Sequence, residues 1–495
     1  MAIVIAVAYF AIISVAVGIY TRRKVKNVND FTKASQGMNW LVLVFAFTLI
    51  PLGAGHTLSL WESAPAFGAS VMWWGIITGG IFLPLMMLWF GPWVRQTGLN
   101  TIPEILEKMF GRTFGRLNAA VNIATWTGIG AAETLATATA IYGLSSGSVP
   151  FVWCTLIALI LIVIYVYFGG ILQLAMLNVV NAIVMIVGSY LGLFMLGGWL
   201  LANINGWEGV KDIYESAGQI GMLQTFNLGD SGMWFQVIIP VTVLHCAAGA
   251  VAQNMNSPFF AARSDKDCRK GVFLGVFFNC MASCPWIVMA LIAAIPAVSA
   301  ILFPGADSDA KLAPIRLALE ALPTPIVGVM MISLLCATLS TGGATVMANA
   351  NVLTNDILKN ALNPKMTDEK KMKLMKVSIL ICALLFAVPA FLNAVIFPVF
   401  LWCFSFGIPV FFVYFMGLKF KVSKSAAWIT IIVAFVVNFW WTFATPSWAT
   451  GPFSLNMYPV TVVSVVLAVV LTAVLPGTPP LLGKKNSLEG LKDAG

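Results

Sequence analysis

The chain has 495 residues, of which 60% are hydrophobic and 9% are charged, with a net charge of +9. A soluble protein would carry roughly a quarter charged residues, so the composition excludes a soluble globular protein. Apolar runs of about 18 or more residues recur from end to end, each long enough to cross a bilayer as a helix. The shorter alternating segments of a membrane β-barrel are absent from the sequence, which predicts an all-α multi-pass membrane protein and not an enzyme.

Thirteen candidate spans follow one another along the chain. Their approximate ranges are 2–20, 39–67, 71–94, 117–142, 150–168, 174–203, 233–255, 271–299, 324–355, 377–393, 394–418, 426–446 and 456–475. If the N-terminus lies outside, every Lys and Arg except Lys211, Lys311 and Arg316 lies in a cytoplasmic linker or the C-terminal tail. This bias predicts a protein of the cell (inner) membrane with a cytoplasmic C-terminus. The basic charge is then expected to face anionic lipid, and no nucleic acid partner is expected.

Two of the predicted spans contain residues that interrupt a helix. The second holds Pro51, Gly53 and Gly55 near mid-depth, and the seventh holds Pro240 and then Gly249. Proline removes a backbone donor and glycine loosens the next turn, so we expect broken helices at both places. Broken helices at matching positions in two halves indicate an inverted-repeat transporter, although proline and glycine are also ordinary in membrane helices.

The linkers between the spans suggest how the chain is organised. The expected parts are a leading helix and cytoplasmic loop (1–38), a first five-helix repeat (39–203), an outer loop (204–232), a second five-helix repeat (233–418), and two trailing helices with a short cytoplasmic tail (419–495). After the third span, Thr101 can cap a short helix with Pro103 and Glu104 in its first turn. Apolar residues at helical spacing predict that this helix lies on the inner membrane surface.

Few ionisable residues fall inside the predicted spans. Glu62 and Glu133 are the only acids there, and His56 and His245 are the only histidines of the chain. A charge at mid-bilayer is costly, so Glu133 is expected to face a cavity or a partner, whereas Glu62 lies near an outer helix end and could instead reach the headgroups. Each histidine is close to one of the expected breaks, where it could line a shared site or be a satisfied buried residue.

A run of hydroxyl and small residues, Ala337–Gly343, lies in the middle of an uncharged apolar stretch. Thr338, Thr341 and Thr345 follow a 3–4 spacing and share one helix face, with Ser340 to its side. Hydroxyls and freed backbone carbonyls are the oxygen ligands of small hard cations, which makes this run a candidate ion site. The alternative is that each hydroxyl bonds a carbonyl one turn earlier in its own helix.

Three motifs give the chain a resemblance to the sodium:solute symporter family. The segment Thr101–Gly111 is similar to the family's Thr-x-Pro-Glu-Tyr-Leu-x-x-Arg-Phe-Gly sequence. The run from Ala337 to Lys359, with Thr354 and Asp356 near its end, resembles the family's sodium-binding helix and its trailing Thr-x-Asp. Gly53-Ala54-Gly55-His56 resembles the broken helix of the sugar-transporting members.

The resemblance implies a LeuT-type fold of ten core helices in two inverted repeats, with one leading helix and trailing helices. It also implies a sodium site, which in this chain would use the backbone carbonyls of Leu49, Leu52 and Ala337 and the hydroxyls of Ser340 and Thr341. Many members carry an Asp in the sixth span where this chain has Asn178, which argues against a second cation site there.

The sequence constrains the solute only weakly. The polar residues that hold sugars in the family's sugar transporters are largely unmatched, and no Lys or Arg lies within a span to pair with a carboxylate. Acids close to aromatic residues favour an amine or a zwitterion through charge and cation–π contact. The candidate solute-binding residues are His56, Trp61, Glu62, Trp74, Glu133 and His245. The oligomeric state is not predicted.

The sequence therefore predicts sodium-coupled symport of a small organic solute by alternating access, with Na⁺ as the coupling ion. One alternative is a proton-coupled symporter that uses Glu133 or His56 as the titrating group. The other is a membrane sensor or channel that does not transport against a gradient.

Overall fold

The computed structural model describes residues 2–86, 90–225, 232, 234–295, 298–300, 310–391 and 396–480. In these ranges the backbone is mostly helical, with no strand beyond two isolated bridges, Met38 with Ala262 and Val422 with Thr478. The all-α class predicted from the sequence is confirmed.

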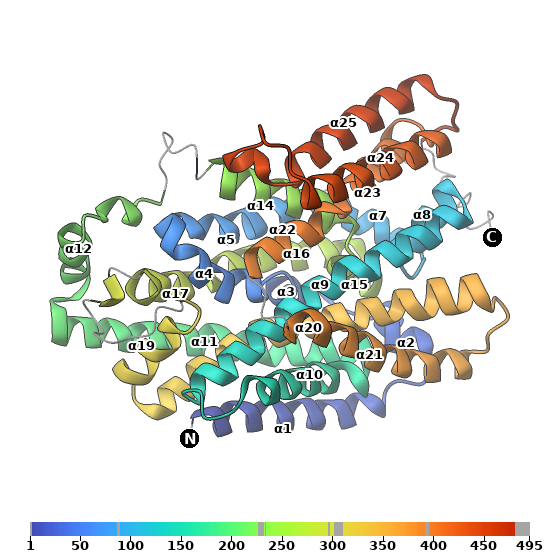
Figure 1. Cartoon of the computed structure of the whole chain (residues 1–495). Helices are drawn as coiled ribbons and strands as arrows, with labels where there is room; N and C mark the ends of the chain where they lie inside the picture. The colour runs from blue at the N-terminus through green and yellow to red at the C-terminus, as the bar shows by residue number, and fades with distance from the viewer. Residues whose placement is uncertain are drawn as a thin grey trace.

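Most of the long helices lie roughly along one direction and form a bundle, and short helices such as α12 run across it (Figure 1). The longer helices are α1 (Ala2–Arg22), α3 (Trp40–Leu49), α4 (Leu58–Phe67), α9 (Arg112–Leu144), α10 (Phe151–Tyr167), α11 (Gly170–Ile204), α16 (Asp265–Ala282), α20 (Thr324–Val352), α21 (Asp368–Phe391), α22 (Ile396–Ser405), α23 (Gly407–Lys419), α24 (Lys424–Phe443) and α25 (Met457–Val474). Shorter helices join or extend them: α2 (Val28–Lys33), α5 (Trp73–Ile77), α6 (Leu83–Leu85), α7 (Gly91–Gln96), α8 (Ile102–Phe110), α12 (Gly206–Ser216), α14 (Ile239–Val243), α15 (Gln253–Ala261), α17 (Cys284–Met289) and α19 (Ala313–Ala321).

Ten helical stretches in the described ranges are long and apolar enough to cross a membrane. Two further apolar helices, α3 and α10, are shorter, and one stretch, Leu58–Leu85, runs from α4 to α6 with a bend at Gly68, whose φ of 51° is not helical. The predicted number of thirteen spans therefore stays a prediction.

Helix α20 lies at the centre of the bundle. Its most apolar window is 89% buried, against 28% for α1 and for α25, so those two helices have most of their surface free to face lipid. α20 contacts α11, α9, α1, α10 and α21, and every residue from Met330 to Val352 is buried. The hydroxyl run is thus held inside a shell of other helices.

Both expected breaks are present. Helix α3 ends at Leu49 and α4 begins at Leu58, with a 3₁₀ turn, η2 (Ala54–His56), between them. Downstream of α14, widened and 3₁₀ turns, η8 (Leu244–Ala248) and η9 (Gly249–Val251), lead to Ala252, whose extended ψ of 128° separates them from α15. The second interruption follows Gly249, not Pro240, because the helical backbone continues through Pro240 from a wide helical turn, η7 (Trp234–Ile238), into α14.

The two ends of the bundle differ in charge. At one end, which we call the α8 end, lie α2, α7 and α8 (Figure 1). Lys33 Nζ joins α2 to the carbonyl of Gly98 in the α7–α8 linker (3.2 Å), and Arg95 joins α7 to Asp265 at the start of α16 (2.9 Å). At the other, the α12 end, lie α12 and α19, which carry the three basic residues that the sequence places outside, Lys211, Lys311 and Arg316, the second of them just before α19.

Two of the sequence motifs meet at the α8 end. Thr101 caps α8 by accepting the Glu104 N–H (3.1 Å), as expected from the sequence, and donates its hydroxyl to Asp356 Oδ1 (2.9 Å) at the end of α20. The side chain of Asn355 donates to Asp356 and accepts from Lys371 Nζ (2.7 Å). Two motifs separated by about 250 residues thus form one buried polar contact.

Candidate functional site

The hydroxyl run of α20 packs directly against the first break. Thr341 Oγ1 lies 2.8 Å from the carbonyl oxygen of Ile50 and 3.3 Å from that of Leu49, and it accepts the N–H of Gly53 at 3.0 Å. All of these groups are buried. In a regular helix these carbonyls would bond the N–H groups of Gly53 and Ala54, but beyond Leu49 those N–H groups bond Thr341 and Glu133 instead, and the Leu49 carbonyl keeps a local bond from the Leu52 N–H (3.0 Å).

Ser340 completes this contact. Its hydroxyl lies 2.8 Å from the carbonyl of Ala337 in its own helix and 3.3 Å from the carbonyl of Leu49. The structure therefore brings together four of the five predicted sodium ligands, Leu49, Ala337, Ser340 and Thr341. All of these donors are neutral oxygens, which can replace the hydration of a monovalent cation without fixing it by a countercharge.

Leu52 is placed differently from the expectation. Its carbonyl accepts the N–H of His56 at 3.1 Å, and none of the hydrogen bonds of the α20 hydroxyls in the described residues reaches it, whereas the Ile50 carbonyl lies 2.8 Å from Thr341 Oγ1. The alternative interpretation of the hydroxyl run holds for Thr345, whose hydroxyl bonds the Thr341 carbonyl one turn earlier (2.7 Å). It does not hold for Thr341, which bonds across to the broken helix.

Glu133 of α9 holds the other side of the same break. Its Oε2 accepts the Ala54 N–H at 2.8 Å, and the residue is completely buried. A Cβ added to Gly53 would meet Oε1 at 2.2 Å, so only glycine lets the carboxylate come this close. Oε1 itself is buried and has no hydrogen-bond partner among the described residues. The carboxylate therefore has one oxygen committed to the backbone and one oxygen available.

A small cavity lies beside the break. Its lining comes from both broken helices and from α5, α9, α20 and α22: Pro51, Gly53, Gly55, His56, Trp74, Trp126, Ile129, Glu133, His245, Met255, Thr341, Phe400 and Phe404. We call it the central cavity. Its free volume is about 20 Å³, room for about one water molecule. A larger solute can enter only if the surrounding helices move apart.

The polar atoms of the central cavity are few. Both ring nitrogens of His56 are buried and lack hydrogen-bond partners in the described part of the chain, as does Glu133 Oε1. The His245 ring is fixed by its bond to the Val241 carbonyl (2.9 Å). Buried groups left unbonded in protein are the ones that a ligand can satisfy.

Aromatic rings form the rest of the wall. Trp74 stands edge-on to His56 and to His245, at centroid distances of 6.2 and 5.4 Å, and contacts Phe400 at 5.8 Å. The cavity therefore combines one carboxylate, two imidazoles and a set of ring faces and edges.

Trp61 and Glu62, also expected to bind solute, lie elsewhere. Trp61 is buried against Trp286 and donates its indole N–H to the Trp286 carbonyl (3.0 Å). Glu62 pairs with Lys311 at 3.4 Å toward the α12 end, and both side chains are largely buried. The turn between His56 and Leu58 places these two residues beyond the cavity. The structure thus groups four of the six expected residues, His56, Trp74, Glu133 and His245, in one place.

Several lining residues were not anticipated from the sequence. Trp126, Phe400 and Phe404 come from helices distant in the chain, and aromatic residues are too common in membrane helices to single out. The Ile50 carbonyl could not be chosen over that of Leu52, because which backbone oxygen turns toward α20 depends on the path of an irregular segment.

Comparison with known proteins gives a consistent result. The sodium:solute symporter family matches residues 31–441. Among similar relatives are the sodium/myo-inositol cotransporter 2 of Rattus norvegicus, 23% identical over 76% of this chain, and the sodium/glucose cotransporter of Vibrio parahaemolyticus, 21% identical over 73%. The matches span 59% of the rat protein and 70% of the Vibrio protein.

Solved structures share the fold. A sodium-coupled sialic acid symporter in a substrate-bound outward-open state superposes with a TM-score of 0.80 at 14% identity, over 96% of this chain and 98% of that chain. A nucleobase-cation-symport-1 family transporter in a closed conformation gives a TM-score of 0.53 at 13% identity, over 94% and 98%. The predicted transporter fold is confirmed by these likenesses.

Proposed function

The chain belongs to the sodium:solute symporter family, and from that membership we propose that it transports a small organic solute into the cell together with sodium. The family is one of transporters and not of enzymes. The observation that carries the proposal is the contact of the Ser340 and Thr341 hydroxyls with the Leu49 and Ile50 carbonyls across the first break.

We propose that Na⁺ binds within this group of neutral oxygens. An ion there would draw the carbonyls of α3 and the hydroxyls of α20 to a common centre and so order the break. Thr341 and Glu133 hold the next two backbone N–H groups, those of Gly53 and Ala54, and both residues also line the central cavity. Ordering the break would therefore shape the cavity, so that sodium and solute favour each other's binding.

The driving force would be the sodium gradient together with the membrane potential, which adds about 2.3 kcal/mol per charge for each 100 mV. We propose that the two five-helix repeats, 39–203 and 233–418, rock about the occupied site to give alternating access. The small free volume of the central cavity, about 20 Å³, supports a closed state between the two open ones.

For the solute, we propose an amine or a zwitterion in the central cavity. An ionised Glu133 would supply negative charge, and the rings of Trp74 and Phe400 offer surfaces that attract a cation. The competing class is a polyol or sugar, because relatives of this chain are named for myo-inositol and glucose.

We also propose an orientation in the cell (inner) membrane. The α8 end carries nearly all the Lys and Arg residues, whereas Lys211, Lys311 and Arg316 belong to the α12 end. By the positive-inside rule the α8 end faces the cytoplasm, which places the N-terminus outside and the C-terminus inside.

One observation favours a second candidate, a proton-coupled symporter. Glu133 is fully buried and presents an unbonded oxygen to the cavity, as a residue that takes up and releases a proton would. The two candidates make opposite predictions about the ion that drives uptake.

Purified protein in liposomes decides between them. Uptake of candidate amines, zwitterions, myo-inositol and glucose is followed under an inward sodium gradient with no proton gradient, and then under the reverse condition. Thermal stability with each solute, measured with and without sodium, identifies the ligand beforehand. We expect uptake and stabilisation only with sodium present; uptake driven by protons alone would overturn the sodium proposal.

A further inference from the structure

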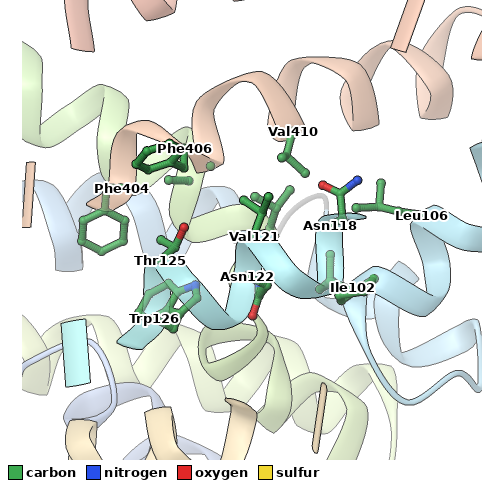
Figure 2. A pocket seen from close by; sticks show the side chains of 14 residues that line it. Ile102, Leu106, Asn118, Val121, Asn122, Thr125, Trp126, Phe404, Phe406 and Val410 are labelled. Atoms are coloured by element: carbon green, nitrogen blue, oxygen red, sulfur yellow. The ribbon is translucent and has the colours of Figure 1, made fainter. Parts of the chain in front are cut away.

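A second cavity lies between the central cavity and the α8 end. We call it the inner chamber; its free volume is about 30 Å³. Its lining is Ile102, Pro103, Leu106, Asn118, Val121, Asn122, Thr125, Trp126, Ala248, Val251, Phe404, Phe406, Gly407 and Val410. Figure 2 shows Asn118 and Thr125 pointing from α9 toward Val410 and Phe406 of the α22–α23 segment. The chamber is thus enclosed by α8, α9, the second break and the α22–α23 segment.

Two aromatic residues, Trp126 and Phe404, line both cavities. Their rings meet edge to face at a centroid distance of 5.4 Å and an angle of 89°, and both residues are buried. One layer of aromatic rings is therefore shared by the wall of the central cavity and the wall of the inner chamber. Rotation of either side chain would join the two spaces.

Helix α9 runs along both cavities. Asn118, Asn122 and Trp126 follow one another at intervals of four residues, and Glu133 lies two further turns along. Residues at these spacings occupy neighbouring positions on one side of a helix. A solute leaving Glu133 toward the α8 end would therefore meet polar side chains of the same helix.

The chamber presents hydrogen-bond acceptors. Asn122 Oδ1 is buried without a partner in the described ranges. Asn118 uses one N–H of its Nδ2 to bond the Phe114 carbonyl in its own helix (2.9 Å), and its Oδ1 is a second acceptor on the chamber wall. Acceptors of this kind suit a ligand that carries N–H or O–H groups.

The far side of the chamber is closed by a contact between α8 and α15. Gln253, the first residue of α15 after the second break, accepts the N–H of Ile102 at 2.8 Å and donates to the Asn100 carbonyl at 3.3 Å. Ile102 is itself part of the chamber wall. The chamber is thus bounded on one side by rings and on the other by hydrogen bonds that helix movement can break.

We propose that the inner chamber is a second, transient binding site for the transported solute, which enters it past Trp126 and Phe404 and is held through its N–H or O–H donors by Asn118 and Asn122. The site lies on the release side of the central cavity, and the Gln253 contact closes it toward the cytoplasm. The proposal rests on the transport function and orientation given above.

Cysteine accessibility tests the position of the chamber. Thr125→Cys places a thiol on the chamber wall, and Ala124→Cys, its neighbour on the outer side of α9, which faces lipid in the proposed membrane orientation and so is out of reach of a water-borne reagent, is the matched control. A membrane-impermeant maleimide is applied to sealed vesicles of either orientation, and labelling is compared with that of the unsubstituted chain. We expect labelling of Thr125→Cys from the α8 end only, reduced by solute, and none of Ala124→Cys. Absence of labelling from the α8 end, with uptake intact, would overturn the proposal.

Sided kinetics test the binding role. Asn118→Ala with Asn122→Ala should raise the KM for solute presented from the α8 end, by about fivefold for each neutral hydrogen bond lost. The KM for solute presented from the α12 end should change less than about twofold, because the central cavity is untouched. Equal changes on both sides would show a purely structural role and reject the site.

Substitution of Trp126 tests whether the aromatic rings separate the two cavities. Trp126→Ala should let the maleimide reach Thr125→Cys from the α12 end also, whereas Trp126→Phe, which keeps a ring, should restore the barrier. No labelling from that side with Trp126→Ala would reject the barrier. If the unsubstituted chain shows no sodium-driven uptake, that result rejects the proposed function. The labelling pattern tests the position of the inner chamber separately, because it does not depend on uptake.

Discussion

The two helix breaks differ in what holds them open. At the first, the freed backbone groups are bonded by side chains from distant helices: Thr341 of α20 takes the Ile50 carbonyl and the Gly53 N–H, and Glu133 of α9 takes the Ala54 N–H. At the second, the carbonyls of Ala250 and Ala252 are bonded by Asn256, only a few residues further along, at 3.0 and 2.8 Å.

The first break therefore depends on neighbouring helices for its hydrogen bonds, whereas the second depends mainly on residues close to it in the chain. The shape of the first depends on where α9 and α20 lie and on any ion or solute placed among them. The second satisfies its own backbone and can move as a unit with α15. We infer that the first break changes shape when ion or solute binds. The second break keeps its shape, and its movement with α15 makes or breaks the contact of Gln253 with α8.

The strongest test removes the α20 hydroxyls. Ser340→Ala with Thr341→Ala takes away two oxygens from the proposed sodium group and also the acceptor of the Gly53 N–H. Loss of hydrogen-bonding partners to a charged group costs about 1.5–3 kcal/mol each, so the sodium concentration for half-maximal uptake should rise by roughly 100-fold or more. Uptake is measured against sodium concentration in proteoliposomes.

Thr134→Ala is the control for that variant. Its hydroxyl is equally buried but bonds only the Gly130 carbonyl of its own helix, at 2.8 Å. We expect sodium dependence within about twofold of the unsubstituted chain, since no ligand of the ion is removed. An unchanged sodium dependence in the double variant would refute the site.

Glycine substitutions compare the two breaks directly. A Cβ at Gly53 would lie 2.2 Å from Glu133 Oε1, so Gly53→Ala must displace the carboxylate that holds Ala54. At Gly249 the nearest atom is a ring carbon of Phe82 at 2.8 Å, which a small tilt can relieve. We expect Gly53→Ala to lower uptake roughly tenfold or more, because it displaces a buried hydrogen bond to a carboxylate. Gly249→Ala should lower uptake by less than about threefold, because only an aromatic ring must shift. Equal losses would remove the distinction between the breaks.

Local signals in the sequence predicted the first break and the hydroxyl run, and the family resemblance predicted that the two lie together. Proline and glycine at positions 51–55 interrupt a helix in any fold, and the hydroxyls at Ser340 and Thr341 stand out in an uncharged stretch. The sequence could not show that Leu52 turns its carbonyl to His56 and that Ile50 faces Thr341 instead. The sequence also grouped Trp61 and Glu62 with His56, because the rotation of the chain through η2 is set by tertiary contacts and not by residue type.

Removing the charge of Glu133 distinguishes its two proposed roles, which are to bond the backbone of the first break and to attract the solute. Glu133→Gln keeps an oxygen that can accept the Ala54 N–H but removes the negative charge. If the solute carries an ammonium group, its KM should rise by roughly 10–100-fold, while half-maximal sodium should change less than threefold. Glu133→Ala, which loses both functions, should shift both quantities. A KM unaltered by Glu133→Gln would favour a neutral solute such as a polyol.

The smallest expected effect concerns the second break, where Asn256 acts locally. Asn256→Ala removes the side-chain donor that bonds the carbonyl of Ala250, and Asn256→Asp keeps the size but replaces the donor by an acceptor. Each should destabilise the protein by about 1–3 kcal/mol, the cost of an unsatisfied buried polar group, seen as a lower melting temperature in detergent. Sodium dependence should stay within about twofold in whatever fraction remains folded, because no group near Ser340 or Thr341 is altered. A large sodium shift in Asn256→Asp would mean that the second break also responds to the ion, and that the two interruptions act as one device.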